Sequence, residues 1–227
     1  MRHVLIGAVA LATLSAPAFA GNQLQNGSFE DGFNGWTVGG VSDDGFPPVV
    51  ISYNNNDGYP TGAYGESIPV DNASSPSPDA AGTHGAYFVA DEAHPQTLSQ
   101  FVSVVLGKTY TFGFDVYVPF NGAANPNDAS FSAVVGGDNF ATFTASSLTP
   151  GTWLHFESTG IANITGNTTF DFAYDSFGFP AKDFVIDKVF FGTPDVPEPA
   201  SWALMLVGFG AVGGVMRSRR SAAVTFA

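Results

Sequence analysis

The chain has 227 residues, of which 44% are hydrophobic and 14% aromatic, and this content excludes intrinsic disorder. It has no cysteine, which excludes disulfides and thiolate metal sites, so a core alone or a core with a bound metal must hold the fold. Residues 21–195 carry 19 acidic residues against three lysines, a net charge of −16. This charge excludes nucleic acid as a partner and repels anionic membranes, and it favours cations, above all Ca²⁺, and neutral polysaccharides.

Residues 1–20 have the order of a secretory signal peptide. Arg2 and His3 come first, an apolar run over residues 4–14 follows, and Ala18 and Ala20 form the small-residue cleavage pair. The apolar run is shorter than the roughly 20 residues of a membrane-spanning helix. The sequence therefore predicts cleavage after Ala20 and export of the rest of the chain.

Residues 21–195 predict one all-β domain. Residues 108–118 alternate strictly, with Tyr110, Phe112 and Phe114 on one side and Asp115 and Tyr117 on the other, which is typical of a half-buried strand. Further strands are expected at 49–53, 85–90, 97–105, 130–135, 139–144, 152–157, 168–174 and 183–191, with turn residues between them. Residues 54–82 predict a long loop. This pattern indicates a jelly-roll β-sandwich.

The domain opens with Asn26-Gly27-Ser28-Phe29-Glu30-Asp31-Gly32-Phe33-Asn34-Gly35-Trp36. This segment resembles the NGSFE-x-G-x-x-GW opening of the galactose-binding-like jelly rolls, a fold shared by many carbohydrate-binding modules. Weaker landmarks follow in the expected order at residues 99–102, 107–112, 151–154 and 184–189. Lys188 departs from the family's usual acidic residue in the last strand. The resemblance covers nearly the whole domain.

The same resemblance implies a structural Ca²⁺ site. In such jelly rolls the first and last strands are neighbours, and a calcium ion often lies near the opening glutamate and the closing aspartate, here Glu30 and Asp187. Calcium takes six to eight oxygen ligands, so backbone carbonyls would have to complete the site. The alternative is that both acids cap turns at the ends of strands.

Four tyrosines are candidate sugar-stacking residues. Sugars present apolar CH faces that stack on aromatic rings, and their hydroxyls bind amides and carboxylates. Exposed rings are expected at Tyr53, Tyr59 and Tyr64 in the long-loop region and at Tyr117 on the polar side of its strand, whereas Trp36 and Trp153 are expected in the core. Ordinary loop packing is the alternative role for these tyrosines.

Signs of catalysis are weak, and the sequence predicts a protein that is not an enzyme. His84, His94 and His155 lack the paired spacing of a metalloprotease, and no nucleophile-elbow motif occurs. Three hypotheses stay open: a surface or matrix protein that contacts exopolysaccharide, a structural or adhesive biofilm protein with no defined ligand, and a secreted hydrolase.

The C-terminus has the features of a membrane-inserted segment. Residues 200–216 contain no charge and span about 25 Å as a helix, the lower limit for crossing a bilayer. Arg217, Arg219 and Arg220 follow directly. Positive charge stays on the cytoplasmic side, so the domain is expected outside the membrane.

Residues 196–220 resemble the PEP-CTERM sorting signal, in which a PEPxxWA motif, a short helix and an arginine cluster follow one another. Pro197, Glu198, Pro199 and Trp202 match the motif. The resemblance implies recognition by exosortase, a membrane protease or transpeptidase, in a Gram-negative bacterium that makes exopolysaccharide. The chain would pass through an inner-membrane intermediate before it reaches the cell surface or matrix. The alternative is a plain membrane anchor.

Overall fold

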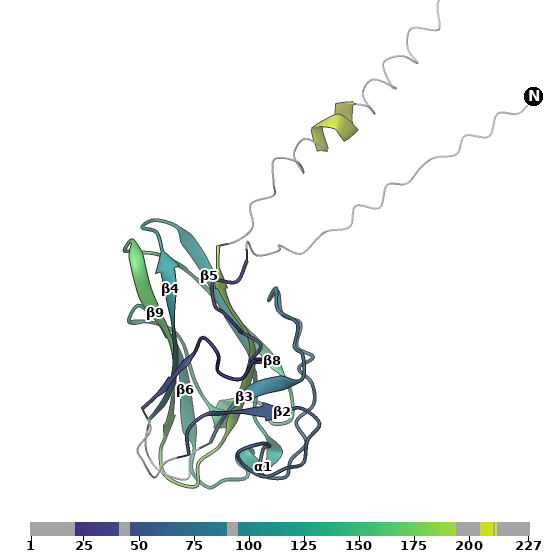
Figure 1. Cartoon of the computed structure of the whole chain (residues 1–227), viewed down its shortest axis with the longest axis vertical. Helices are drawn as coiled ribbons and strands as arrows, with labels where there is room; N and C mark the ends of the chain where they lie inside the picture. The colour runs from purple at the N-terminus through teal and green to yellow at the C-terminus, as the bar shows by residue number, and fades with distance from the viewer. Residues whose placement is uncertain (1–20, 41–45, 90–94, 194–204, 211, 213–227) are drawn as a thin grey trace, which may run out of the picture. The chain divides into compact units, whose positions relative to one another are not determined.

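The computed structural model describes residues 21–40, 46–89, 95–193, 205–210 and 212. It divides into two units, one up to residue 194 and one from residue 195 onward. The first unit is an antiparallel β-sandwich (Figure 1). The predicted signal peptide and the motif residues Pro197, Glu198, Pro199 and Trp202 lie outside the described residues, as does the arginine cluster.

Ten strands among the described residues form two five-stranded sheets. The first sheet has the order β1 (Thr37–Gly39), β4 (Gln96–Val104), β9 (Gly166–Ser176), β6 (Ala129–Val135) and β7 (Asp138–Thr144). The second has the order β2 (Val49–Ser52), β3 (His84–Phe88), β10 (Phe184–Gly192), β5 (Thr109–Tyr117) and β8 (Leu154–Ile161). All strand pairs are antiparallel, which confirms the predicted all-β sandwich. Strand β1 was not predicted.

Phenylalanine fills the space between the sheets, which explains its high frequency in the sequence. Phe112, Phe114, Phe131 and Phe172 are at most 1% exposed. The ring of Phe172 meets Phe114 edge-on, with centroids 5.1 Å apart, and lies 5.2 Å from Phe131. Trp36 packs on Phe172 as predicted for a core residue. Edge-to-face and offset contacts of this kind add to the gain from burying apolar area.

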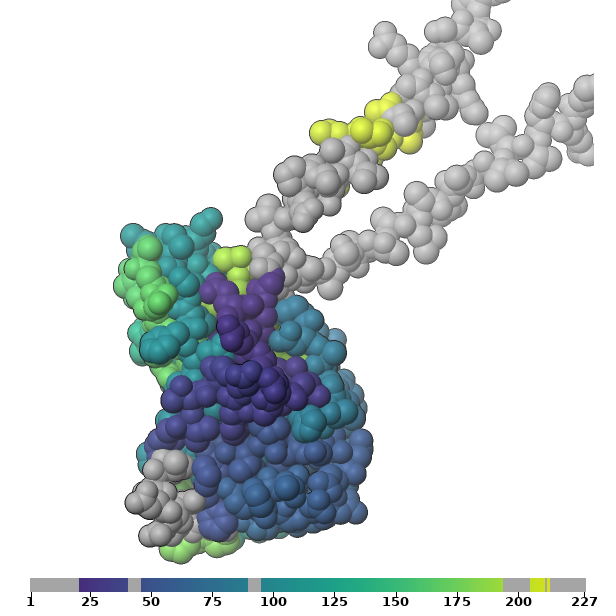
Figure 2. Space-filling view, in the orientation of Figure 1, coloured from purple at the N-terminus to yellow at the C-terminus, as the bar shows by residue number. Residues whose placement is uncertain are grey.

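Strand β5 is buried on both faces, so the prediction of a half-buried strand is wrong. Asp115 and Tyr117, expected on an outer polar face, are 0% and 3% exposed. The reason is that the long loop between β2 and β3 packs on this sheet, where its Asp71 lies 3.2 Å from the Lys188 ammonium of β10. The loop forms part of the blue surface in Figure 2. Ile68 of that loop joins Tyr53, Tyr117 and Trp153 in a second hydrophobic cluster. Alternate side chains of β5 therefore point into two different buried layers, the core between the sheets and the cluster under the long loop.

The first and last residues of the domain lie at one end of the sandwich, and helix α1 lies at the other. Residues 22–27 run beside β10, where the Gln23 amide donates to the Phe191 carbonyl and the Val189 amide donates to the Gly27 carbonyl. The domain thus begins and ends at one end of the sandwich, here called the chain-exit end (Figure 1). The opposite end carries the short helix α1 (Phe120–Ala123) and is called the α1 end. A single 3₁₀ turn, η1 (Ala145–Ser147), follows β7.

The predicted C-terminal helix is described in part. Residues 205–210 and 212 are helical and exposed. Within the part of the chain that the structure describes, no helix reaches the length and hydropathy needed to cross a membrane. The predicted span over residues 200–216 stays a prediction.

The Phe131→Ala substitution should destabilise the domain by about 3–5 kcal/mol, because it removes a fully buried ring and leaves a cavity between the sheets. Phe101→Ala, which truncates a side chain that is 73% exposed on β4, is the matched control and should change stability by less than about 0.5 kcal/mol. Urea unfolding followed by tryptophan fluorescence measures both. Equal effects would contradict this description of the core.

Candidate functional site

A cavity of about 210 Å³ opens at the α1 end of the sandwich. Its lining combines one aromatic ring, two amides and a carboxylate with small apolar groups. The lining residues are Tyr64, Val89, Asn121, Gly122, Asn125, Pro180 and Asp183. They come from four separate parts of the chain: the loop after β2, the residue that follows β3, the α1 segment and the loop before β10.

Glu66 fixes the long loop to α1. Its carboxylate accepts the backbone amides of Phe120 and Asn121 at 2.9 and 2.7 Å, which satisfies two amides at the start of the helix. The Asn121 side chain donates to the carbonyls of Ala63 and Tyr64. These bonds hold Tyr64 beside Asn121 at the mouth of the cavity.

Asp183 supplies the buried acid of the cavity and is only 2% exposed. Its carboxylate accepts the hydroxyl of Tyr87. Burial, followed by the charge of Asp183, raises the pKa of Tyr87, so this hydroxyl keeps its proton and continues to donate. Gly122 approaches Asp183 so closely that a Cβ there would lie 2.7 Å from the Asp183 Cβ, and only glycine fits.

Aromatic rings gather around the cavity. Tyr64 is 44% exposed and stacks on Tyr59, with ring centroids 6.0 Å apart and an interplanar angle of 16°. Tyr59 in turn packs edge-on against Phe46. Phe120 and Phe179, from α1 and the loop that carries Pro180, are 65% and 63% exposed. The α1 end therefore presents flat apolar rings next to polar groups.

The structure brings together two of the four predicted tyrosines. Tyr59 and Tyr64 form the stacked pair, whereas the prediction of exposed rings at Tyr53 and Tyr117 is wrong because they are 7% and 3% exposed. Both pack on Trp153 under the long loop. Sequence reasoning missed the polar residues of the cavity. The asparagine-rich segment 121–127 was the available signal for Asn121 and Asn125.

A second polar cluster lies beneath the long loop. The Lys188 ammonium is 3.2 Å from Asp71 and 3.3 Å from Asp115, and it donates to the Ala73 carbonyl at 3.2 Å. His155 contacts the other oxygen of Asp115 at 2.6 Å. Burial alone would lower the pKa of His155, but the hydrogen bond and charge of Asp115 raise it above its usual value.

Asp187 lies next to this cluster and is fully buried. Its carboxylate accepts the Tyr53 hydroxyl at 2.7 Å and the Lys188 amide at 2.6 Å. Burial, reinforced by the charge of Asp71, raises the pKa of Asp187 to about 9. Asp187 is therefore protonated at neutral pH.

The residues predicted to bind calcium have different partners. Glu30 accepts the backbone amides of Thr83 and His84 at 2.7 and 2.8 Å, and although burial raises its pKa, these bonds lower it, so the group is ionised. Asp187 instead faces Tyr53. Among the described residues no group of three or more His, Asp or Glu side chains could hold a metal ion. Backbone carbonyls would have to supply most ligands, and calcium binding stays a prediction.

Comparison with known proteins identifies the C-terminal segment. Residues 195–220 match the model of the PEP-CTERM protein-sorting motif. This confirms the predicted sorting signal, which implies that the protein is exported, processed by an exosortase and sorted to the cell surface. No match was found among the curated proteins.

Several solved structures are similar to the sandwich domain in fold. The complex of TmCBM61 with beta-1,4-galactotriose is 20% identical and has a TM-score of 0.49, covering 77% of this chain and 99% of its own. A Family 16 Carbohydrate Binding Module-2 is 17% identical, with a TM-score of 0.45, over 75% and 99% of the two chains. The K3 adhesin domain of Lys-gingipain from Porphyromonas gingivalis is 13% identical, with a TM-score of 0.48, over 77% and 98%.

The stability of the domain should fall as pH rises from about 5 to 8. Asp187 holds its proton up to a pKa of about 9 when folded and releases it near pH 4 when unfolded, so the unfolded state binds fewer protons in this interval. The slope is at most about 1.4 kcal/mol per pH unit for one group. Asp187→Asn should flatten the decline measured by urea unfolding at several pH values. The exposed Asp138→Asn is the control, and an undiminished slope in Asp187→Asn would contradict the assignment.

If calcium stabilises the domain through Glu30, millimolar Ca²⁺ should raise the melting temperature of the parent protein and not that of Glu30→Ala. An ion that binds only the folded state raises the free energy of unfolding by RT ln(1 + [Ca²⁺]/Kd). A concentration about 100-fold above Kd therefore raises it by about 2.7 kcal/mol. Scanning calorimetry with Ca²⁺ or with chelator measures the shift. Mg²⁺ serves as the ion control. A Ca²⁺-dependent rise that persists in Glu30→Ala would remove Glu30 from the site.

Proposed function

We propose that the sandwich domain binds exopolysaccharide without cleaving it, with the cavity at the α1 end as the saccharide site. The observation that carries this proposal is the position of Tyr64, a partly exposed ring beside Asn121 in a polar cavity. A sugar can stack its CH face on such a ring while amides and a carboxylate bind its hydroxyls. As part of this proposal, we assign the domain the fold of a galactose-binding-like jelly roll.

The size and surroundings of the cavity favour one unit of a longer glycan. Its volume of about 210 Å³ is below the roughly 300–1,000 Å³ of sites for drug-sized ligands, so it suits a single sugar ring. The exposed rings of Phe120 and Phe179 could then contact the neighbouring units. The strongly negative domain would repel an anionic polysaccharide, which favours a neutral one.

The acid content of the cavity favours binding over hydrolysis. Glycosidases of the common type use two carboxyl groups, about 5–5.5 Å apart in retaining enzymes and about 6.5–9.5 Å apart in inverting enzymes. Among the described residues that line the cavity, Asp183 is the one acid, and Tyr87 already binds it. This composition supports a protein that is not an enzyme.

We infer the route to this location from the two terminal signals. The signal peptide directs the domain, residues 21–195, across the inner membrane of a Gram-negative bacterium, and residues 200–216 hold the chain in that membrane. Exosortase then recognises Pro197, Glu198 and Pro199, while Arg217, Arg219 and Arg220 retain the tail on the cytoplasmic side. The processed domain reaches the cell surface or the biofilm matrix.

Tyr64→Ala should weaken binding of the host's neutral exopolysaccharide about tenfold, since one aromatic contact contributes about 0.5–1.5 kcal/mol beyond buried area. Tyr64→Phe keeps the ring and should retain most of the affinity. Calorimetric titration of residues 21–194 measures both, and Phe101→Ala is the control for an exposed ring elsewhere. An unchanged affinity in Tyr64→Ala would exclude this cavity as the saccharide site.

The parent domain itself tests the two alternative functions. If it binds no glycan on an array or in titration, a structural or adhesive role replaces the proposal. Turnover of the polysaccharide would indicate a hydrolase.

A further inference from the structure

The chain-exit end carries an exposed aliphatic surface that the proposed function does not use. Leu106 and Ile161 are 64% and 71% exposed, and Val105 and Ile164 are each 47% exposed. They belong to the loop between β4 and β5 and to the end of β8 with the loop that follows it. These four residues are called the aliphatic tip.

The two loops of the aliphatic tip form one surface. The Gly107 amide donates to the Ala162 carbonyl at 2.8 Å, and the Ala162 amide donates to the Lys108 carbonyl at 2.9 Å. The Leu106 amide donates to the Thr165 hydroxyl at 2.9 Å. Hydrogen bonds therefore hold both loops together, and their aliphatic side chains remain exposed.

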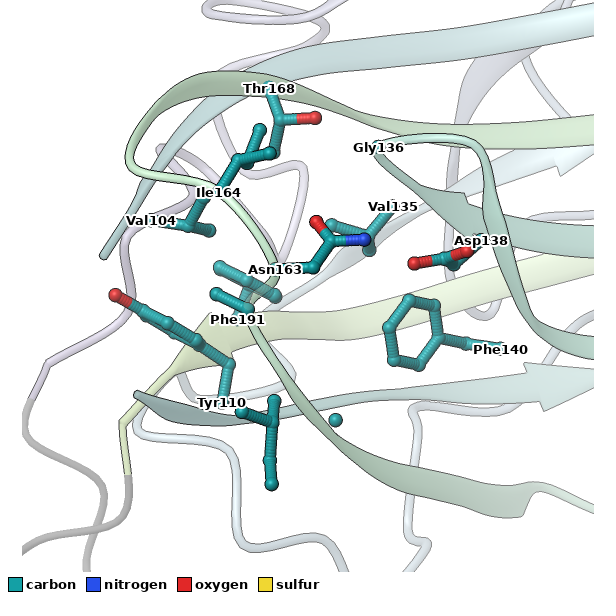
Figure 3. Close-up of a pocket in the computed structure, with 13 residues that line it drawn as sticks. Val104, Tyr110, Val135, Gly136, Asp138, Phe140, Asn163, Ile164, Thr168 and Phe191 are labelled. Atoms are coloured by element: carbon teal, nitrogen blue, oxygen red, sulfur yellow. The ribbon is translucent and has the colours of Figure 1, made fainter. Parts of the chain in front are cut away.

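A small cavity lies within the same end and is mainly apolar. It has a volume of about 50 Å³ and is lined by residues that include Val104, Phe140, Ile164 and Phe191. Figure 3 shows Val104, Ile164 and Phe191 on one side of this cavity and Phe140 with Asp138 on the other. The aliphatic tip thus continues inward as apolar surface.

The domain leaves toward its sorting segment at this end. Gly192, the last residue of β10, pairs with Thr111, and Thr109, two residues earlier on β5, pairs with Ile161. Two residues of a strand span about 7 Å, and β10 and β8 flank β5 with spacings of about 4.8 Å each, so the chain exit lies roughly 12 Å from Ile161 of the aliphatic tip. Residues 193–199 then connect the domain to the uncharged segment that begins at residue 200, and seven extended residues reach at most roughly 25 Å.

Charge at the aliphatic tip differs from that of the whole domain. The domain as a whole is strongly acidic, but residues 105–108 and 161–165 contain Lys108 and no acid. Asp138 is the acid beside the small cavity. Local repulsion from a bilayer surface is therefore weak where the aliphatic residues are exposed.

We propose that the aliphatic tip docks on the outer surface of the lipid bilayer while the uncharged C-terminal segment is inserted in the membrane. Exposed aliphatic side chains at a membrane surface enter the boundary between headgroups and acyl chains. The short connection keeps the tip at a high effective concentration near the lipid, so a weak contact is occupied. Release of the C-terminal segment removes this tether and with it the docking.

Site-specific labelling tests this docking directly, because the chain contains no cysteine. The mature chain, residues 21–227, is reconstituted in phosphatidylcholine vesicles with an environment-sensitive fluorophore on Leu106→Cys. Phe179→Cys at the α1 end is the matched control, since the two parent side chains are 64% and 63% exposed. Spin-labelled phosphatidylcholine should quench the fluorophore at residue 106 about threefold or more above that at residue 179, because docked residues enter lipid by about 5–10 Å.

Equal quenching at residues 106 and 179 would overturn the proposal. Energy transfer between labelled chains that rises with protein density, without lipid quenching at residue 106, would also overturn it and identify a contact between two copies.

A second variant distinguishes docking from simple proximity to the membrane. The changes Ile161→Ser and Val105→Ser, added together to the Leu106→Cys chain, should lower the quenching at residue 106 toward that of residue 179. The Phe101→Ser change on β4 is its control and should leave the quenching unchanged. An unchanged quenching in the double variant would show that the aliphatic side chains do not hold the contact.

Discussion

The ammonium group of Lys188 joins four parts of a strongly acidic domain. It lies on β10 and contacts Asp115 on β5 and both Asp71 and the Ala73 carbonyl of the long loop. Asp115 in turn contacts His155 on β8. Removing the lysine would leave two buried carboxyl groups, those of Asp71 and Asp115, without this cation, which is far more costly than the loss of a surface ion pair. A β-bulge places this side chain: the register between β10 and β5 shifts between Asp187 and Phe190, and Lys188 has a φ of 47°.

The cavity at the α1 end depends on this cluster through the long loop. Asp71 and Ala73 fix one part of the loop over the second sheet, and Trp153 donates to the Pro69 carbonyl beside them. The loop then carries Glu66, which binds the start of α1, and Tyr64, which borders the cavity. One continuous loop therefore links the ion pairs of Lys188 to Tyr64, which lines the cavity. The geometry of the cavity thus depends on packing and ion pairing at the second sheet.

The strands and the core could be predicted from the sequence because alternation is a local property. Phe112 and Phe114 show it directly, and the position of Trp36 in the opening motif indicated its burial. The same alternation could not show that residues 54–82 cover the outer face of β5, which buries Tyr117. Strand β1 escaped prediction because three residues are too few to show a period. Asp183 and Asn121 are 62 positions apart in the chain, and only the folded structure brings them into one cavity.

Lys188 also has a physical role that the sequence could not reveal. The last strand presents its ammonium group to three oxygen-bearing neighbours: Asp71, Asp115 and Ala73. A covalently attached cation provides the charge that a bound metal ion could otherwise provide, and it needs no free ion in the medium. This lysine therefore places a cation beside the buried Asp71 and Asp115, while Glu30, which accepts the backbone amides of Thr83 and His84, belongs to a separate set of hydrogen bonds.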